Sequence, residues 1–98
     1  MKMNFYSIFD SAVCAYMRPF VMQTDGQALR SFSDESVRAD GDISSHPEDY
    51  SLYRIGSFDD NEGEIKAIEP YCIGRAHELA AATRERGYET KLESVKDA

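Results

Sequence analysis

Aromatic and arginine side chains alternate in two short segments of this chain, and this pattern could bind single-stranded DNA. Bases stack on aromatic rings without sequence preference, and interspersed arginines contact the phosphates. Tyr16, Arg18 and Phe20 alternate along one predicted strand and are therefore expected on one face. Tyr53 precedes Arg54 in another predicted strand. The alternative is that these rings fill the core or a subunit interface, which a small domain needs for stability, and this use is favoured here.

Acidic side chains are concentrated in the middle of the chain. Residues 24–64 contain eleven Asp and Glu against three Arg, and the whole chain has a net charge of −7. This charge repels the phosphate backbone and argues against broad coating of DNA, but it favours docking on a basic partner such as a DNA-binding replication enzyme. The candidate docking residues are Glu48, Asp49, Asp59, Asp60 and Glu62.

Two groups of residues could carry catalysis or bind a metal ion. His46 is close in sequence to Glu48 and Asp49, but acid–base catalysis usually also needs a nucleophile or a metal, and no neighbouring residue supplies one. The acidic turn 59–64 has its glycine in the fifth place and a proline in the twelfth, whereas a calcium-binding EF-hand has glycine sixth and glutamate twelfth. We therefore predict no cofactor, no metal ion and no enzymatic activity.

Cys14 and Cys72 are the only cysteines, and they are far apart in sequence. They could form a disulfide, but two buried free thiols are favoured in a reducing cytoplasm. No apolar run is long enough to span a membrane, and the N-terminus is unlike a secretion signal. We therefore expect no membrane contact and a location inside a bacterial cell.

Hydrophobic patterns predict four strands and two helices. The strands are expected at 3–9, 15–22, 51–58 and 65–72, and the helices at 25–37 and 73–87. Pro19 cannot donate a ladder hydrogen bond, so the second strand should lie at an edge or contain a bulge there. Thr24 and Gln27 form a capping box before the first helix, and residues 38–50 are expected to form a loop. Gly63 fits the positive φ of a hairpin turn.

The 98 residues are expected to form a single α+β domain over 1–90, followed by a polar tail at 91–98. The element order β-β-α-β-β-α indicates a four-stranded, mainly antiparallel sheet with two helices. Strands 3–9 and 15–22 are apolar on both faces, which two helices on one face cannot cover. Either the second helix crosses to the far face or a second subunit covers it, and we favour a homodimer.

Several segments occur in the same order in one family of phage proteins. These segments are Met3–Ser11, Tyr16–Phe20, Gly26–Phe32 and His46–Gly63. Together they resemble the small nonstructural protein of gokushoviruses, tailless phages of the microvirus group with single-stranded DNA genomes. The resemblance covers roughly residues 3–72 and includes no catalytic motif.

The resemblance implies a nonstructural protein that works in the host bacterial cytoplasm and is absent from the mature virion. It also implies an accessory role in viral DNA replication, in which single-strand synthesis coupled to packaging is favoured over further duplex amplification. Three modes of action are open. The chain could be a regulatory adaptor that binds the phage replication initiator or replication complex through its acidic middle, 38–64. It could instead bind single-stranded DNA directly, or act as a scaffold or host-takeover factor.

Overall fold

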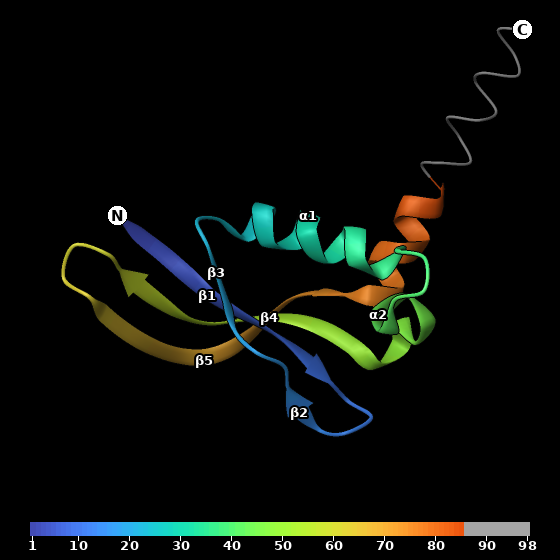
Figure 1. Ribbon diagram of the computed structural model, residues 1–98, viewed down its shortest axis with the longest axis horizontal. Helices are drawn as coiled ribbons and strands as arrows, with labels where there is room; N and C mark the ends of the chain where they lie inside the picture. Colours follow the sequence, from blue (N-terminus) through green and yellow to red (C-terminus); the bar gives the residue numbers. More distant parts are fainter. Residues whose placement is uncertain (86–98) are drawn as a thin grey trace, which may run out of the picture.

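The computed structural model describes residues 1–85 as an α+β fold in which helices pack on a curved antiparallel sheet (Figure 1). This confirms the predicted fold class. In chain order the elements are β1 (Lys2–Asp10), β2 (Ala15–Tyr16), β3 (Phe20–Met22), α1 (Asp25–Ser36), α2 (Asp42–Ser45), the 3₁₀ turn η1 (Pro47–Asp49), β4 (Tyr50–Asp59) and β5 (Glu64–Arg75). Residues 76–85 follow as a further helix.

The sheet is antiparallel and centred on the long strands β1 and β4. Their pairing runs from Lys2 opposite Asp59 to Asp10 opposite Tyr50, and β4 pairs in turn with β5. β2 and β3 both pair with the other edge of β1. The predicted four-strand arrangement is therefore present, with the second strand divided into two pieces. The turn between β4 and β5 has Gly63 at φ 67°, the positive value that the sequence predicts.

The division between β2 and β3 falls around Pro19, as the missing amide hydrogen of proline predicts. Just before it, the edge strand is still attached to β1 by two hydrogen bonds. The Met17 amide donates to the Ile8 carbonyl at 2.8 Å, and the Ser7 hydroxyl donates to the Met17 carbonyl at 2.6 Å. The predicted edge position and irregularity are both confirmed.

Helix α1 begins where the capping box predicts. Thr24 Oγ1 accepts a hydrogen bond from the Gln27 amide at 3.2 Å, and Gln27 Oε1 accepts one from the Gln23 amide at 3.2 Å. Asp25 in the first turn suits the positive end of the helix dipole. The sheet-facing stripe of the helix buries Ala28, Phe32 and Ser36.

One hydrophobic core lies between the sheet and the helices. Its buried side chains are Tyr6, Ala28, Phe32, Ile43, Leu52 and Ala76. Full burial of a Phe or Leu side chain stabilises a fold by about 1.5–3 kcal/mol, so this core is what attaches the helices to the sheet. None of the helices within residues 1–85 is long and apolar enough to cross a membrane.

The prediction of a plain loop over 38–50 is wrong, because α2 and η1 each form one turn there. Ile43 is only 8% exposed and anchors α2 in the core. The hydroxyls of Ser44 and Ser45 donate to the Gly41 carbonyl at 3.0 and 2.7 Å and hold the turn closed. Single turns have no repeated hydrophobic stripe, so periodicity does not reveal them.

The last helix begins at residue 76, and the prediction of a start at residue 73 is wrong. Ile73–Arg75 instead extend β5 and pair with β4. Gly74 lowers helix propensity at this point, while neighbouring β4 offers backbone partners. Gly87, which the pattern predicts as the end of this helix, and the tail 91–98 lie outside the described residues.

Candidate functional site: an open sheet face and an acidic end

The long helix α1 and the helix at 76–85 lie on the same side of the sheet (Figure 1). A Cβ atom at Gly74 of β5 would lie 2.7 Å from Leu29 Cδ1 of α1 and 3.2 Å from Leu79 Cδ1 of the last helix. Both helices therefore cover the face to which Gly74 belongs. The alternative in which the second helix crosses to the far face is wrong for residues 76–85.

The opposite side of the sheet, here called the open face, is covered by none of the helices within residues 1–85. Paired residues of antiparallel strands point to the same side, so the register shows which side chains lie there. They are Met3, Phe5, Ser7, Phe9, Tyr16, Val21, Ser51, Tyr53, Phe58, Ile65, Ala67, Cys72 and Arg75. Arg75 is the only charged residue among these paired positions, although the chain contains 18 acidic residues.

Three aromatic rings gather at one end of the open face. The ring centroids of Phe9 and Tyr16 are 4.9 Å apart, those of Tyr16 and Tyr53 are 5.7 Å apart, and those of Phe9 and Tyr53 are 6.2 Å apart. Tyr16 is 46% exposed. Burial raises the pKa of Tyr53, and the positive charge of nearby Arg75 partly offsets this rise. The cluster therefore combines one exposed ring, that of Tyr16, with two partly buried rings and one neighbouring cation.

An apolar hollow of about 310 Å³ lies toward the other end of the open face. Its lining residues are Phe5, Pro19, Ile55, Gly56, Ile65, Lys66 and Ala67. Phe5 packs edge-on against Phe58 with ring centroids 6.0 Å apart, while Val21 and Ile65 are 39% and 68% exposed. The open face thus presents apolar side chains over most of its length.

The structure divides the candidate DNA contacts between two faces of the sheet. Tyr16 and Tyr53 lie together on the open face, but Phe20 stacks on Tyr6 at the core, with ring centroids 5.8 Å apart. The expectation that Tyr16, Arg18 and Phe20 share one face is therefore wrong. Tyr16 and Phe20 are four residues apart in the edge strand, whereas their partners in β1, Phe9 and Tyr6, are three residues apart. This one extra residue in the edge strand reverses which side of the sheet its later side chains face. Arg18 is exposed between β2 and β3.

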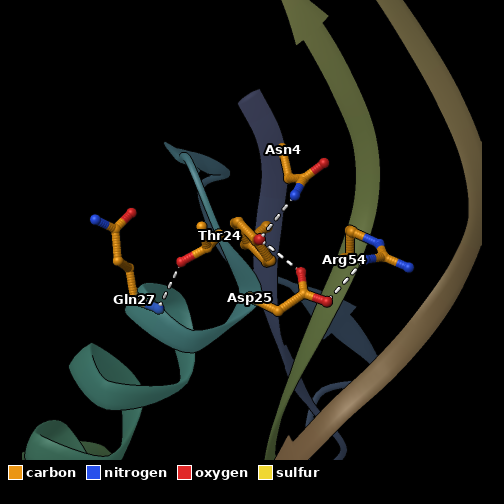
Figure 2. A network of polar contacts seen from close by, with 6 residues as sticks. Asn4, Thr24, Asp25, Gln27 and Arg54 are labelled. Atoms are coloured by element: carbon orange, nitrogen blue, oxygen red, sulfur yellow. Dashed lines mark hydrogen bonds and ion pairs between the residues drawn. The ribbon is translucent and has the colours of Figure 1, made fainter. Parts of the chain in front are cut away.

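Arg54 belongs to a polar network at the start of α1. Its guanidinium pairs with Asp25 at 2.7 Å and lies 5.5 Å from the ring centroid of Tyr71. Asp25 also accepts a hydrogen bond at 2.7 Å from the hydroxyl of Tyr6, which in turn accepts one from Asn4 at 3.1 Å. Figure 2 shows Asp25 at the start of α1 beside Arg54. Burial and the hydrogen bond to Asp25 raise the pKa of Tyr6 to about 12. This network ties α1 to the sheet, so Arg54 already has a structural partner.

The five candidate docking residues lie near the two ends of β4, at too great a distance to form one surface. Glu48 and Asp49 precede the strand, while Asp59, Asp60 and Glu62 end or follow it. The 10 residues of β4, at about 3.4 Å each, separate the two groups by roughly 30 Å. The acidic middle of the sequence therefore becomes two separate acidic surfaces.

Positive groups partly neutralise the acids at the hairpin between β4 and β5. The N-terminal amine of Met1 pairs with Asp60 at 2.5 Å, and Lys66 lies 3.6 Å from Glu64. Lys2 lines a small hollow together with Asp59, Glu62 and Glu64. The hairpin is therefore only weakly negative for its number of acidic residues.

The opposite end of β4 carries a second group of acids, here called the acidic end, which consists of Asp10, Asp42, Glu48 and Asp49 around Tyr50. Burial raises the pKa of Tyr50, and the negative charges of Asp10, Asp42 and Asp49 raise it further. Among residues 1–85, no ion pair engages any of these four acids. Within residues 1–85, the acidic end thus presents four carboxylates that form no ion pair.

His46 lies next to the acidic end, and one of its ring nitrogens lies within 4.8 Å of one carboxylate oxygen of Glu48 and one of Asp49. These three residues could together ligate a cation, and the absence of a bound metal stays a prediction. Both cysteines are free, as favoured from the sequence. Cys14 is nevertheless exposed and Cys72 is only partly buried, so the expectation of two buried thiols is wrong.

Two residues of the open face, Phe9 and Arg75, are absent from the predicted DNA contacts. Alternation along residues 3–9 already places Phe9 on the same side of the strand as Phe5, so the sequence pattern could have identified Phe9 as a residue of this face. Arg75 gave no such signal, because the hydrophobic pattern places it inside the predicted helix. Its position on the sheet follows from the longer β5 alone.

The fold and these two surfaces define a small α+β protein with an exposed apolar sheet face and a separate acidic end. Residues 3–79 match the family described as Phage ORF5 protein. This match covers most of the chain, and the chain belongs to that family of bacteriophage proteins. No curated protein and no solved structure matches the chain.

Proposed function

We propose that this chain is a phage accessory protein of the gokushovirus type, which regulates replication of single-stranded viral DNA by binding and without catalysis. Membership of the Phage ORF5 family supports the phage setting. The segments of residues 3–72 that resemble gokushovirus nonstructural proteins support the narrower role. The protein works in the host bacterial cytoplasm, outside the mature virion, and favours single-strand synthesis coupled to packaging over duplex amplification.

The acidic end is the docking surface in this proposal, and its partner is the phage replication initiator or the complex built on it. The observation that carries this assignment is the gathering of Asp10, Asp42 and Asp49 around Tyr50 without a basic partner within residues 1–85. A protein that holds DNA phosphates needs a basic surface. Opposite charges on two such surfaces speed association and select the correct partner.

Binding of the purified chain to the replication initiator tests this docking surface. The double variant Glu48→Gln with Asp49→Asn removes two charges at the acidic end, and we expect it to weaken binding about tenfold. The matched control, Asp59→Asn with Glu62→Gln, removes the same charge at the hairpin and should leave affinity nearly unchanged. Wild-type affinity should fall as salt rises. Equal losses in both double variants, or no dependence on salt, would contradict the assignment.

The regulatory role itself is tested in infected cells. A phage that encodes the acidic-end double variant should accumulate less single-stranded viral DNA relative to duplex DNA than a phage that encodes the hairpin double variant. Quantitative hybridisation with strand-specific probes measures this ratio. A ratio equal to that of wild type would contradict the role in replication, even if the purified variant binds the initiator weakly.

Direct binding of single-stranded DNA is the second candidate function, favoured by the cluster of Phe9, Tyr16 and Tyr53 beside Arg75. Stacking of one base on an aromatic ring contributes about 1–3 kcal/mol. Fluorescence polarisation with a labelled oligothymidylate at low salt measures this interaction. Joint replacement of Tyr16 and Tyr53 by Ala should then abolish binding, while Tyr71→Ala on the helix-covered face should not. No binding by the wild-type chain at low salt would exclude this candidate.

A further inference from the structure

We propose that a second copy of this chain covers the open face, so that two sheets pack face to face in a two-fold dimer. The proposal does not depend on the replication role. It starts from β1, whose two sides are covered unequally by the helices. Tyr6 is fully buried under the helices, while Phe5 and Phe9 face the open side. The described helices leave this second apolar side without a layer of its own.

The composition of the open face is that of a buried surface. An antiparallel sheet that meets water on one side carries alternating polar residues there. Here the open-face side of β1 carries Met3, Phe5 and Phe9, which are partly exposed, and its only polar residue, Ser7, is buried. Contiguous apolar patches beyond a few hundred Å² mark interaction surfaces in soluble proteins. The open face therefore favours an apolar partner layer over permanent exposure to water.

The outline of the open face approaches the area that each partner buries in a stable dimer. Four strands at about 4.8 Å spacing and nine residues at about 3.4 Å rise give roughly 600 Å² in outline, before the relief of the side chains is added. A standard protein interface buries about 800 Å² of accessible surface on each partner. Packed sheets lie about 10 Å apart with interdigitating side chains, and the apolar hollow beside Phe5 and Ile65 gives the second layer room to insert.

The charge distribution favours a second copy over DNA on this face. Two chains of net charge −7 repel each other in most orientations, but the paired positions of the open face contain no acidic residue. A two-fold axis across the strands also places Arg75 of each copy over the β4–β5 hairpin of the other, where the Glu62 side chain is exposed. A DNA strand gains less, because one paired arginine faces its phosphates while the acidic end flanks the aromatic cluster.

Sedimentation equilibrium of the full 98-residue chain tests the dimer over a range of concentrations. We expect a mass of twice 11.1 kDa for wild type. Val21→Glu puts a charge on the open face, where Val21 pairs with Phe5, and should give a monomer. The matched control is Val13→Glu, which alters a residue 68% exposed in the turn after β1 and should remain a dimer. A monomeric wild type, or equal behaviour of the two variants, would overturn the proposal.

A second variant keeps the test valid if Val21→Glu fails to fold. Ile65 is 68% exposed, so Ile65→Glu removes little packing from the monomer and circular dichroism should show a folded chain. We expect it to dissociate the dimer at least tenfold more readily than Val13→Glu. Arg75→Glu should weaken the dimer as well, and Glu62→Lys added to it should restore part of the affinity. A folded Ile65→Glu variant that dimerises like wild type would overturn the proposal.

An oligothymidylate added to the wild-type chain separates the two possible occupants of the open face. We expect the mass to stay that of the dimer. Binding of the oligonucleotide with dissociation into monomers would show that DNA is the preferred occupant and would overturn the proposal. None of these experiments contains the replication initiator, so their failure is distinguishable from a failure to bind it.

Discussion

Replacing Tyr6 by Phe removes one hydroxyl from the network that joins α1 to the sheet. That hydroxyl donates to Asp25 at 2.7 Å, and the Tyr6 side chain is fully buried. A hydrogen bond to a charged group contributes about 1.5–3 kcal/mol to stability. Because the Asp25 side chain is 40% exposed, the lower end of this range applies. At neutral pH we therefore expect Tyr6→Phe to lower the free energy of unfolding by about 1.5 kcal/mol and the melting temperature by roughly 6–12 °C.

The same hydroxyl makes the stability of the fold depend on alkaline pH. The pKa of Tyr6 is raised from 10.0 to about 12, so the folded chain holds this proton more tightly than the unfolded chain. The resulting stability is complete below pH 10 and is lost as the pH rises toward 12. At pH 11 the loss is about 1.4 kcal/mol. Because Phe cannot ionise, the difference between wild type and Tyr6→Phe should shrink from about 1.5 kcal/mol at pH 8 to nearly zero at pH 11.

Urea unfolding followed by circular dichroism at these two pH values measures both free energies. Thr24→Ala is the matched control, because it weakens the same helix start without removing an ionisable group. Its cost should be equal at the two pH values. A Tyr6→Phe difference that is also equal at pH 8 and pH 11 would show that burial and Asp25 do not keep this phenol protonated in the fold.

Three further substitutions test other parts of the fold by urea unfolding at neutral pH. Thr24→Ala removes the acceptor for the Gln27 amide and should cost about 1 kcal/mol, whereas no loss would show that the cap is dispensable. Gly56→Ala would place a Cβ atom 2.6 Å from the Lys66 carbonyl oxygen, so about 1–3 kcal/mol should be lost, and unchanged stability would contradict the close strand approach. Phe32→Ala empties a site that is 2% exposed and should cost about 3–5 kcal/mol, while a loss below about 1 kcal/mol would contradict the central place of Phe32 in the core.

Elements whose physics is local could be predicted from the sequence. The start of α1 followed from Thr24 and Gln27, because the cap hydrogen bonds join residues only three or four positions apart. The break in the edge strand followed from Pro19, which lacks an amide hydrogen. The turn between β4 and β5 followed from Gly63, whose positive φ is easiest for glycine.

Features that depend on contacts between distant segments could not be predicted from the sequence. Arg54 looked available for phosphate because its partner Asp25 is 29 residues away. Phe20 lies on the face opposite to the predicted one because the edge strand has one more residue than the paired part of β1, which reverses the alternation. The pattern within one strand does not show how many residues its partner strand has. The helical turn around Ile43 depends on burial in the core and not on any repeated stripe. The open face was foreseen only as an excess of apolar residues on 3–9 and 15–22.

A dilution series followed by NMR tests most directly whether the open face is a binding surface. Amide spectra of the isotopically labelled 98-residue chain are recorded from high to low protein concentration. We predict that amide resonances of Phe5, Val21, Tyr53 and Ile65 shift with concentration while those of α1 stay fixed. Resonances that are independent of concentration throughout the sheet, or shifts confined to the helix-covered side, would contradict the account.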